Sequence, residues 1–280
     1  MHILVDLHTS FIRQVVPTII LGRFLGKQVV LSYYRNQAEI DLEQVFWWMG
    51  PFLHLCHRIV VSNDSTANLF LKYGINTVVI PPSIDSQLLE PREITSVQPK
   101  ILVSRSLEKR NNMTCIIEAF GLVKQKYPRA EMTIAGDGPE RPKLEEMVMH
   151  KRLTGITFNG PVQSGQLSRL YTEADLYINV SSIDGLPVSL LEALAVGLPV
   201  ITTGVGGIPS VITDRKNGLF VNPDDPAQLA GTIIKLVESP NLVKSLSEQA
   251  RLSISSQSIP GIKERWRSLY HSLNRHYNRK

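Results

Sequence analysis

The sequence lacks the features that mark disulfide-rich and membrane-spanning proteins. Its 280 residues include two cysteines, Cys56 and Cys115, which are too few and too far apart for a disulfide scaffold. No uninterrupted apolar run reaches the roughly 20 residues that a membrane-spanning helix needs, and no signal peptide is recognisable. We therefore expect a soluble, globular, cytoplasmic protein in which both cysteines are buried as small apolar residues.

Metal ligands are also scarce. The sequence has no Asp-x-Asp pair, and His54 and His57 flank Cys56 without a second ligand cluster or the spacing of a zinc motif. A dinucleotide-binding Gly-x-Gly-x-x-Gly motif starting at Gly204 fails because Pro209 stands where the third glycine belongs. We accordingly expect no metal and no cofactor, and we discount a Rossmann-type oxidoreductase.

The net charge of +5 is concentrated at one end of the chain. Residues 1–99 carry seven basic and eight acidic side chains, whereas residues 263–280 carry six basic and one acidic. This distribution argues against a general nucleic-acid surface. The same final segment places an apolar stripe on one face of a predicted helix, formed by Ile262, Trp266, Leu269, Tyr270, Leu273 and Tyr277. The stripe either packs across the N-terminal domain or lies on anionic lipid at the inner membrane face.

Most of the chain alternates between short apolar, β-branched strands and helices, which predicts parallel, doubly wound α/β sheets. A strand–helix–strand unit covers residues 1–34, a polar loop followed by an apolar helix is expected from 35–44 onward, and a Pro-containing linker is expected at 86–99. A second α/β region starts with the strand at 100–104 and includes a polar helix at 164–173. We expect two Rossmann-like domains, residues 1–99 and 100–262, followed by the C-terminal helix at 263–280.

The segment SSIDGLPVSLLEALAVGLPVITT, residues 181–203, organises the second domain. Pro187 suits the first turn of a short apolar helix and Gly197 suits its left-handed C-cap. Glu192 lies inside this helix, where a carboxylate is costly to bury unless groups such as a pair of hydroxyls bond it. The loop of Asp184 and Gly185 supplies backbone N–H groups that suit an anion. A plain βαβ unit with a capping Asp and a salt-bridged Glu remains the alternative.

At this point the chain resembles a known family. DGLPVSLLEALAVGLPVITTGVGGIPSVI is similar to the acid-x7-acid signature of family-four retaining glycosyltransferases with the GT-B fold, with Asp184 in place of the usual Glu. The resemblance implies that Asp184 approaches the hydroxyls of the donor sugar and that Glu192 binds the ribose hydroxyls. It also implies that a nucleotide diphosphate is held by the backbone around Gly185, Leu186, Pro187 and Val188. Gly160 and Val162 resemble the segment whose backbone contacts the nucleotide base.

Two cations follow the strand at 100–104. Arg105 ends that strand, and Arg110 lies five residues later in a loop that can return to the same edge, with Lys109 as its rival. Two positive charges there could neutralise a leaving diphosphate. The resemblance implies the same role, although the family usually has Lys where Arg110 stands and the two are not equivalent at a phosphate. Solvated surface charges are the alternative for both residues.

The resemblance also covers GRFLGKQVVLSYY, RIVVSNDSTANLFLKYGI and VVIPPSID, which look like the second half of the family's N-terminal, acceptor-side domain. By this resemblance we expect the first half of that domain to be missing, and Tyr34 stands where the family tends to have His. The resemblance implies a metal-independent transferase that moves a sugar to an unidentified glycan or lipid-linked acceptor. A catalytically impaired donor-binding protein is the alternative. An epimerase or phosphorylase would need an acid, His or Lys cofactor site that is not evident in the sequence.

Overall fold

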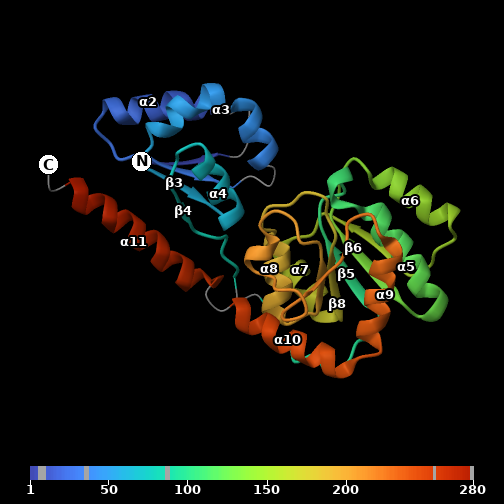
Figure 1. The fold of residues 1–280 in the computed structure, drawn as a ribbon. Coiled ribbons are helices and arrows are strands. Elements are labelled where there is room, and N and C mark those ends of the chain that lie inside the picture. Colours follow the sequence, from blue (N-terminus) through green and yellow to red (C-terminus); the bar gives the residue numbers. More distant parts are fainter. Residues whose placement is uncertain (6–10, 35–37, 86–88, 255–256, 278–280) are drawn as a thin grey trace. The chain divides into compact units, whose positions relative to one another are not determined.

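The computed structural model describes residues 1–5, 11–34, 38–85, 89–254 and 257–277 of the chain (Figure 1). They form two compact units. The first unit comprises residues 1–83, 184–186 and 259–280, and the second comprises residues 84–183 and 187–258. Each unit is built on one parallel sheet, which confirms the predicted α/β class.

The first unit has a four-stranded sheet in the order β1-β2-β3-β4. Its strands are β1 (His2–Val5), β2 (Val30–Tyr33), β3 (Arg58–Val61) and β4 (Thr77–Val79). A π-helical segment (Phe11–Val15) leads into α2 (Val16–Phe24), and α3 (Ala38–His54) and α4 (Asp64–Lys72) follow. The three α-helices share one face of the sheet, because their buried residues pack with one alternate set of strand side chains.

The other face of this sheet is covered by α11 (Ile259–Tyr277), whose course along the sheet is visible in Figure 1. Its buried residues pack with the opposite set of strand side chains, and this cluster contains Val30, Val60, Ile80, Ile262, Leu269 and Leu273. At its rim the ring of His2 lies 4.9 Å from that of Trp266. Of the stripe expected from the sequence, Ile262, Trp266, Leu269 and Leu273 therefore pack against this sheet, whereas Tyr270 is exposed. The side chain of Tyr277 lies outside the described residues.

Two segments differ from expectation. The polar loop expected at 35–44 is wrong from Ala38 onward, where α3 begins, because Ala, Leu, Glu and Gln are good helix formers whatever their polarity. The linker expected at 86–99 contains residues that are buried within the second unit, among them Leu89, Ile94 and Val97. These apolar side chains, spaced along the segment, pack against the second unit and hold the irregular backbone in place.

The second unit has a six-stranded sheet in the order β10-β9-β8-β5-β6-β7. Its strands are β5 (Lys100–Ser104), β6 (Glu131–Ala135), β7 (Ile156–Gly160), β8 (Leu176–Asn179), β9 (Val200–Thr202) and β10 (Leu219–Phe220). All pairings between these strands are parallel. The order reverses at β5, which has β6 on one side and β8 on the other.

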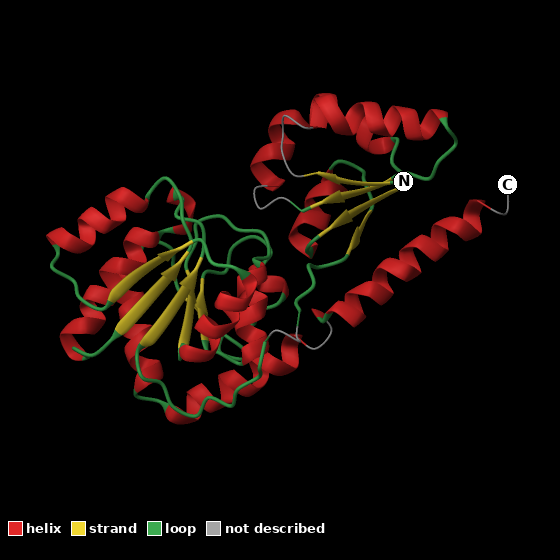
Figure 2. Cartoon of the chain, turned by 180° about the vertical axis from the view of Figure 1, so that it is seen from behind, coloured by secondary structure: helices red, strands yellow, loops and turns green. Residues whose placement is uncertain are grey.

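Helices cover both faces of this sheet (Figure 2). They are α5 (Met113–Lys126), α6 (Arg141–His150), α7 (Ser164–Glu173), α8 (Val188–Val196), α9 (Pro226–Val237) and α10 (Pro240–Ile254). Helix α5 packs with α9, and α8 packs with α10. In an open parallel sheet, ligands bind outside the carboxyl ends of the strands at the point where the order reverses. Within the part of the chain that the structure describes, no helix is long and apolar enough to cross a membrane.

Candidate functional site

The carboxyl ends of β5, β6 and β7 are bound closely together by backbone hydrogen bonds. The N–H of Arg105 donates to the carbonyl of Ala135 at 3.0 Å, and that of Gly136 donates to the carbonyl of Gly160 at 2.8 Å. A Cβ atom on Gly136 would lie 1.9 Å from the carbonyl oxygen of Arg105. Only glycine fits there, so the close approach of these strand ends depends on residue 136.

The side chain of Arg105 is held by an asparagine that the sequence analysis missed. One guanidinium nitrogen of Arg105 donates to Oδ1 of Asn111 at 2.7 Å. The amide of Asn111 donates in turn to the carbonyl of Ser106 at 2.7 Å and to its hydroxyl at 3.0 Å. Asn111 is 2% exposed, so this network fixes the guanidinium at the strand end. In the sequence Asn111 is one polar residue among several in a loop, and nothing there distinguishes it.

The loop of Arg110 is tied to the loop that follows β8. The backbone carbonyl of Arg110 accepts from the N–H of Ser182 at 2.9 Å and from its hydroxyl at 3.2 Å. The loop does return to the same edge of the sheet, as the sequence analysis expected. The guanidinium of Arg110 lies 2.9 Å from the carboxylate of Glu108, so an anionic ligand would have to compete with this pairing.

Glu192 is half-buried, and its partner is a phenol. The hydroxyl of Tyr171 on α7 donates to Oε2 of Glu192 and also reaches the carbonyl of Ser189, both at 3.0 Å. Burial raises the pKa of the Glu192 carboxyl, and the hydrogen bond from Tyr171 partly opposes that rise. The alternative of a salt-bridged Glu192 has no support here, because among the described residues no ion pair includes it.

A second tyrosine connects this part of α8 to the end of β5. The hydroxyl of Tyr177 donates to Oγ of Ser189 at 2.8 Å and lies 3.4 Å from the carbonyl oxygen of Ser104, the residue before Arg105. Hydrogen bonds thus run from β5 through Tyr177 and Ser189 to the Tyr171–Glu192 pair. The structure therefore links the segments of Arg105 and Glu192 through hydrogen bonds. Neither tyrosine was singled out from the sequence, where each appears as an ordinary aromatic residue.

The ends of α8 follow the expected pattern with one change. Gly197 is the left-handed C-cap, with φ of 91°. Pro187 is the N-cap and has extended geometry, with ψ of 131°, so Val188 is the first helical residue. Placing Pro187 in the first helical turn was therefore wrong by one position, which is within the usual uncertainty of a helix start.

The loop of residues 184–186 belongs to the first unit. Asp184 is buried, and its Oδ1 accepts a hydrogen bond from the N–H of Gly185 at 2.9 Å. The amide that the resemblance offers to a diphosphate is therefore bonded to its neighbour's carboxylate in this structure. Leu186 is also buried, whereas Val188 is exposed.

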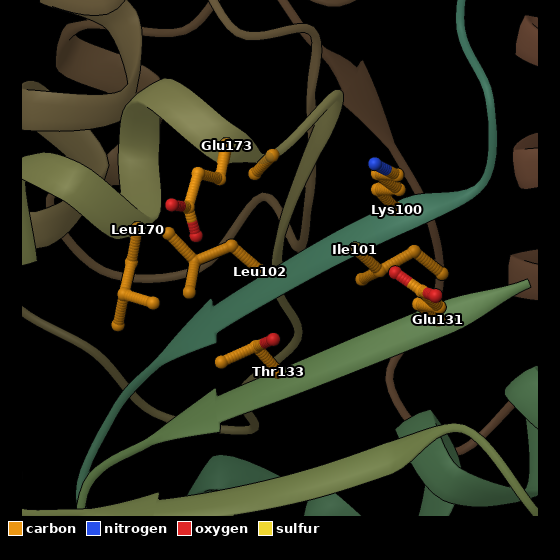
Figure 3. Close-up of a pocket in the computed structure, with 8 residues that line it drawn as sticks. Lys100, Ile101, Leu102, Glu131, Thr133, Leu170 and Glu173 are labelled. Atoms are coloured by element: carbon orange, nitrogen blue, oxygen red, sulfur yellow. The ribbon is translucent and has the colours of Figure 1, made fainter.

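Two adjoining pockets in the second unit lie beside α7. One, of about 460 Å³, is lined by Val162 with Asn159 and Pro161 on the strand side and by Gln166 and Arg169 on the helix side. The other, of about 170 Å³, is drawn in Figure 3. It contains Lys100 and Glu131, the first residues of their strands, and so lies away from the carboxyl ends. Leu170 and Glu173 line both pockets, and of the predicted site residues only Val162 lines either one.

Known structures share this fold. The Anabaena protein HepE, solved in complex with UDP, superposes with a TM-score of 0.82 at 16% identity, over 97% of this chain and 78% of that one. The C-terminal domain of LpcC, a glycosyl transferase group 1 family protein from Francisella tularensis, has a TM-score of 0.56 at 23% identity. That match covers 63% of this chain and 99% of the domain. At such identities the likeness establishes the fold, which is that of GT-B glycosyltransferases.

Curated relatives match most of this chain at low sequence identity. Alpha-monoglucosyldiacylglycerol synthase of Acholeplasma laidlawii is 26% identical over 216 residues, which cover 71% of this chain and 54% of that protein. N-acetyl-alpha-D-glucosaminyl L-malate synthase of Bacillus anthracis is 27% identical over 184 residues, which cover 62% of this chain and 48% of that protein. The chain thus spans about half the length of the curated relatives it matches.

The family assignment rests on a stretch that lies mostly in the second unit. Residues 86–253, more than half of the chain, match the family model described as glycosyl transferases group 1. This stretch includes Arg105, Arg110, Gly160, Val162, Asp184 and Glu192. The chain therefore belongs to the glycosyl transferases group 1 family.

Proposed function

We propose that this chain transfers a sugar from a nucleotide-diphosphate-sugar donor to a glycan or lipid-linked acceptor, with retention of anomeric configuration and without a metal ion. The observation that carries the proposal is the hydrogen-bonded connection between the Arg105 strand end and Glu192 on α8. It supports a site that offers both a cation and a carboxylate at one sheet edge. The UDP bound to HepE supports a nucleotide diphosphate as the leaving group.

In this proposal Arg105 and Arg110 act on the departing diphosphate. Negative charge grows on the phosphate oxygen of the leaving diphosphate as its bond to the anomeric carbon breaks. A guanidinium held in place beforehand stabilises that charge without reorganisation. Asn111 is a positioning residue for Arg105, since it holds the guanidinium at 2.7 Å. Arg110 would have to break its ion pair with Glu108 to bind the phosphate. It would therefore stabilise the leaving diphosphate less than Arg105 does.

The two carboxylates bind hydroxyl groups of the donor. Glu192 accepts hydrogen bonds from the ribose, and Tyr171 holds its Oε2 in place. Asp184 approaches the hydroxyls of the transferred sugar and acts with the two cations in the catalytic step. For Asp184 to do so, a donor must break or share its bond to the amide of Gly185.

Backbone groups complete the donor site. The positive end of α8 favours the diphosphate, and the segment Gly185, Leu186, Pro187 and Val188 leads into that end. Gly160 and Val162 contact the nucleotide base through their backbone. Gly160 has φ of 69°, a conformation that favours glycine.

The test compares the chain with Glu192→Gln for release of free nucleotide diphosphate from a panel of sugar donors and a crude acceptor extract. Gln has about the same size as Glu but carries no charge. We expect the loss of the carboxylate to weaken the free energy of donor binding by about 2 kcal/mol. Glu146→Gln on α6 is the matched control, because that carboxylate is exposed. Equal release by the unaltered chain and Glu192→Gln would contradict the proposed site.

A second candidate function is donor binding without turnover, and Tyr34 favours it. Its hydroxyl donates to the carbonyl of Ile80 at 2.9 Å, and burial raises its pKa to about 12. A phenol in that state is a poor substitute for a histidine that exchanges protons near neutral pH. Donor binding by calorimetry without release of nucleotide diphosphate would favour this candidate, and turnover by the chain would eliminate it.

A further inference from the structure

The outward surface of the helical layer in the first unit is apolar to an unusual degree. We define the α2–α3 face by Ile20, Leu21, Phe24, Leu25 and Trp47, all exposed. Phe24 is 84% exposed and Trp47 is 81% exposed. Because these large side chains are so exposed, most of their apolar surface is in contact with water in the folded chain. Grouped exposed apolar side chains usually mark a contact surface.

The exposed residues of α2 belong to a helix that is firmly packed on its inner side. Its residues Ile19 and Gly22, together with Val15 just before it, are buried against the sheet. Ile20, Leu21 and Phe24 lie on the opposite side, following the helical period. The helix is therefore apolar on both sides, which is expected where a second apolar medium covers the outer side.

The helices that form this face lie side by side. Both α2 and α3 belong to the cluster packed on one face of the sheet, and Figures 1 and 2 show them next to each other over the strands. Arg23 at the end of α2 reaches the ring of His57, just after α3, at 2.6 Å. The apolar side chains of the two helices thus belong to one surface.

The charged side chains that the structure describes around this face are basic. Arg13, Arg23 and Lys27 are exposed around α2, and residues 11–34 and 46–63 contain no Asp or Glu. The acids of α3 are Glu39, Asp41 and Glu43, in its first half, whose side chains are outside the described part of the chain. Exposed aromatic and aliphatic groups flanked by basic residues fit the interface of an anionic bilayer, where apolar side chains enter the acyl boundary and cations meet the headgroups.

We propose that the α2–α3 face binds peripherally to anionic lipid membranes. The inference does not depend on the proposed transfer reaction, since it concerns another surface and is tested without a sugar donor. It also differs from a contact through the basic helix α11, which covers the opposite face of the same sheet. The exposed cations of α11 are accompanied by Glu264, which lies 3.5 Å from Arg267. One flat membrane cannot engage both sides of the sheet at once.

The experiment is co-sedimentation of the full chain with vesicles made of equal parts phosphatidylglycerol and phosphatidylcholine, compared with vesicles of phosphatidylcholine alone. We expect binding to the anionic vesicles only, and a decrease of about tenfold in partitioning for Phe24→Glu. The matched control is Met149→Glu on α6, which introduces the same charge at an apolar residue that is 70% exposed. We expect this control to bind like the unaltered chain.

Fluorescence supplies a second measurement that is independent of the charge introduced. The chain has three tryptophans, and we expect the anionic vesicles to cause a blue shift that Trp47→Phe removes and Trp266→Phe retains. Circular dichroism of each variant checks that it remains folded. Absence of vesicle binding would overturn the proposal. So would binding that survives Phe24→Glu but is lost in the double variant Arg265→Glu, Arg267→Glu, since α11 would then be the contact.

Discussion

The two units differ in where they place their polar and apolar side chains. In the second unit the helix α5 buries seven residues, including Phe120 and Ile117, and the strand ends carry a network of arginine, asparagine and tyrosine hydrogen bonds. In the first unit α2 buries Ile19 and exposes Ile20, Leu21 and Phe24. The same parallel α/β architecture thus has a hydrogen-bonded polar network at the strand ends in the second unit and an apolar outer surface on a helix of the first.

This contrast shows that the topology of a sheet does not by itself determine the function of the unit built on it. Both sheets are parallel and both have helices that bury an apolar stripe. The two units differ in the residues on the outer side of each helix and at the strand ends. These positions can vary because they do not form the hydrophobic core. The predictions below test the contrast by disturbing one unit at a time.

We expect the largest effect from Gly136→Ala in the second unit. The new Cβ would collide with the backbone of Arg105, and the φ of 149° adds strain, so unfolding should become easier by on the order of 3 kcal/mol. Chemical denaturation followed by circular dichroism measures this change. The matched control is Gly231→Ala on α9, which has open space around it. If both variants lost equal stability, the close approach of the strand ends would not matter.

A smaller effect is expected from Tyr171→Phe. Loss of the buried hydroxyl should cost about 1–2 kcal/mol of stability. The hydrogen bond from Tyr171 lowers the pKa of Glu192, so its removal raises that pKa. On acidification the carboxylate then becomes neutral at a higher pH, and donor binding should be lost at a higher pH than in the unaltered chain. Calorimetric titration with donor across a pH series measures the shift. Tyr127→Phe, which removes a phenol hydroxyl bonded to Glu238 and not to Glu192, should leave the profile unchanged. Identical profiles for all three proteins would contradict the role of Tyr171.

The smallest effect concerns pH and the first unit. Partial desolvation and the positive charge of the N-terminus lower the pKa of His2. Its ring contacts the hydroxyls of Ser32 at 2.7 Å and Tyr270 at 2.9 Å. The neutral ring is therefore favoured in the folded chain, and the unfolded chain takes up a proton first as the pH falls. Stability should decrease as the pH drops from the unperturbed pKa of 6.5 toward the lower folded value.

Urea denaturation above and below that unperturbed pKa measures this slope, and His2→Phe keeps an aromatic ring beside Trp266 while removing the titration. We expect a flatter dependence in that variant. A slope that stays the same in His2→Phe would assign the pH dependence to another group.

Strong local patterns explain why several elements were predicted to the residue. The strand Lys100–Ser104 and the helix Ser164–Glu173 were both expected with these bounds. A short β-branched run ending in a polar residue, and a polar helix between two apolar strands, leave few alternatives. Helix α3 was placed too late because its first residues are polar, and the sequence does not show whether a polar segment continues a helix or forms a loop.

The residues that hold the proposed site were harder to predict than its chemistry. Arg105 and Glu192 attract attention because a cation at a strand end and an acid in an apolar helix are unusual in themselves. Asn111 and Tyr171 are ordinary in sequence, and they matter only because folding brings them to within 3.0 Å of those two side chains. Such a partnership is a property of distance in space, and separation along the chain does not reveal it.

By itself, the sequence determined the alternation of strands and helices, the parallel sheets that follow from it, and the acid-x7-acid and arginine motifs that place the chain near its family. These are local patterns, set by side-chain periodicity and backbone preference within a few residues. Tertiary structure alone decided that Gly136 has no room for a side chain, that two tyrosines connect α8 to β5, and that the apolar residues of α2 face outward. Each depends on which segments pack together, and packing joins residues far apart in the chain.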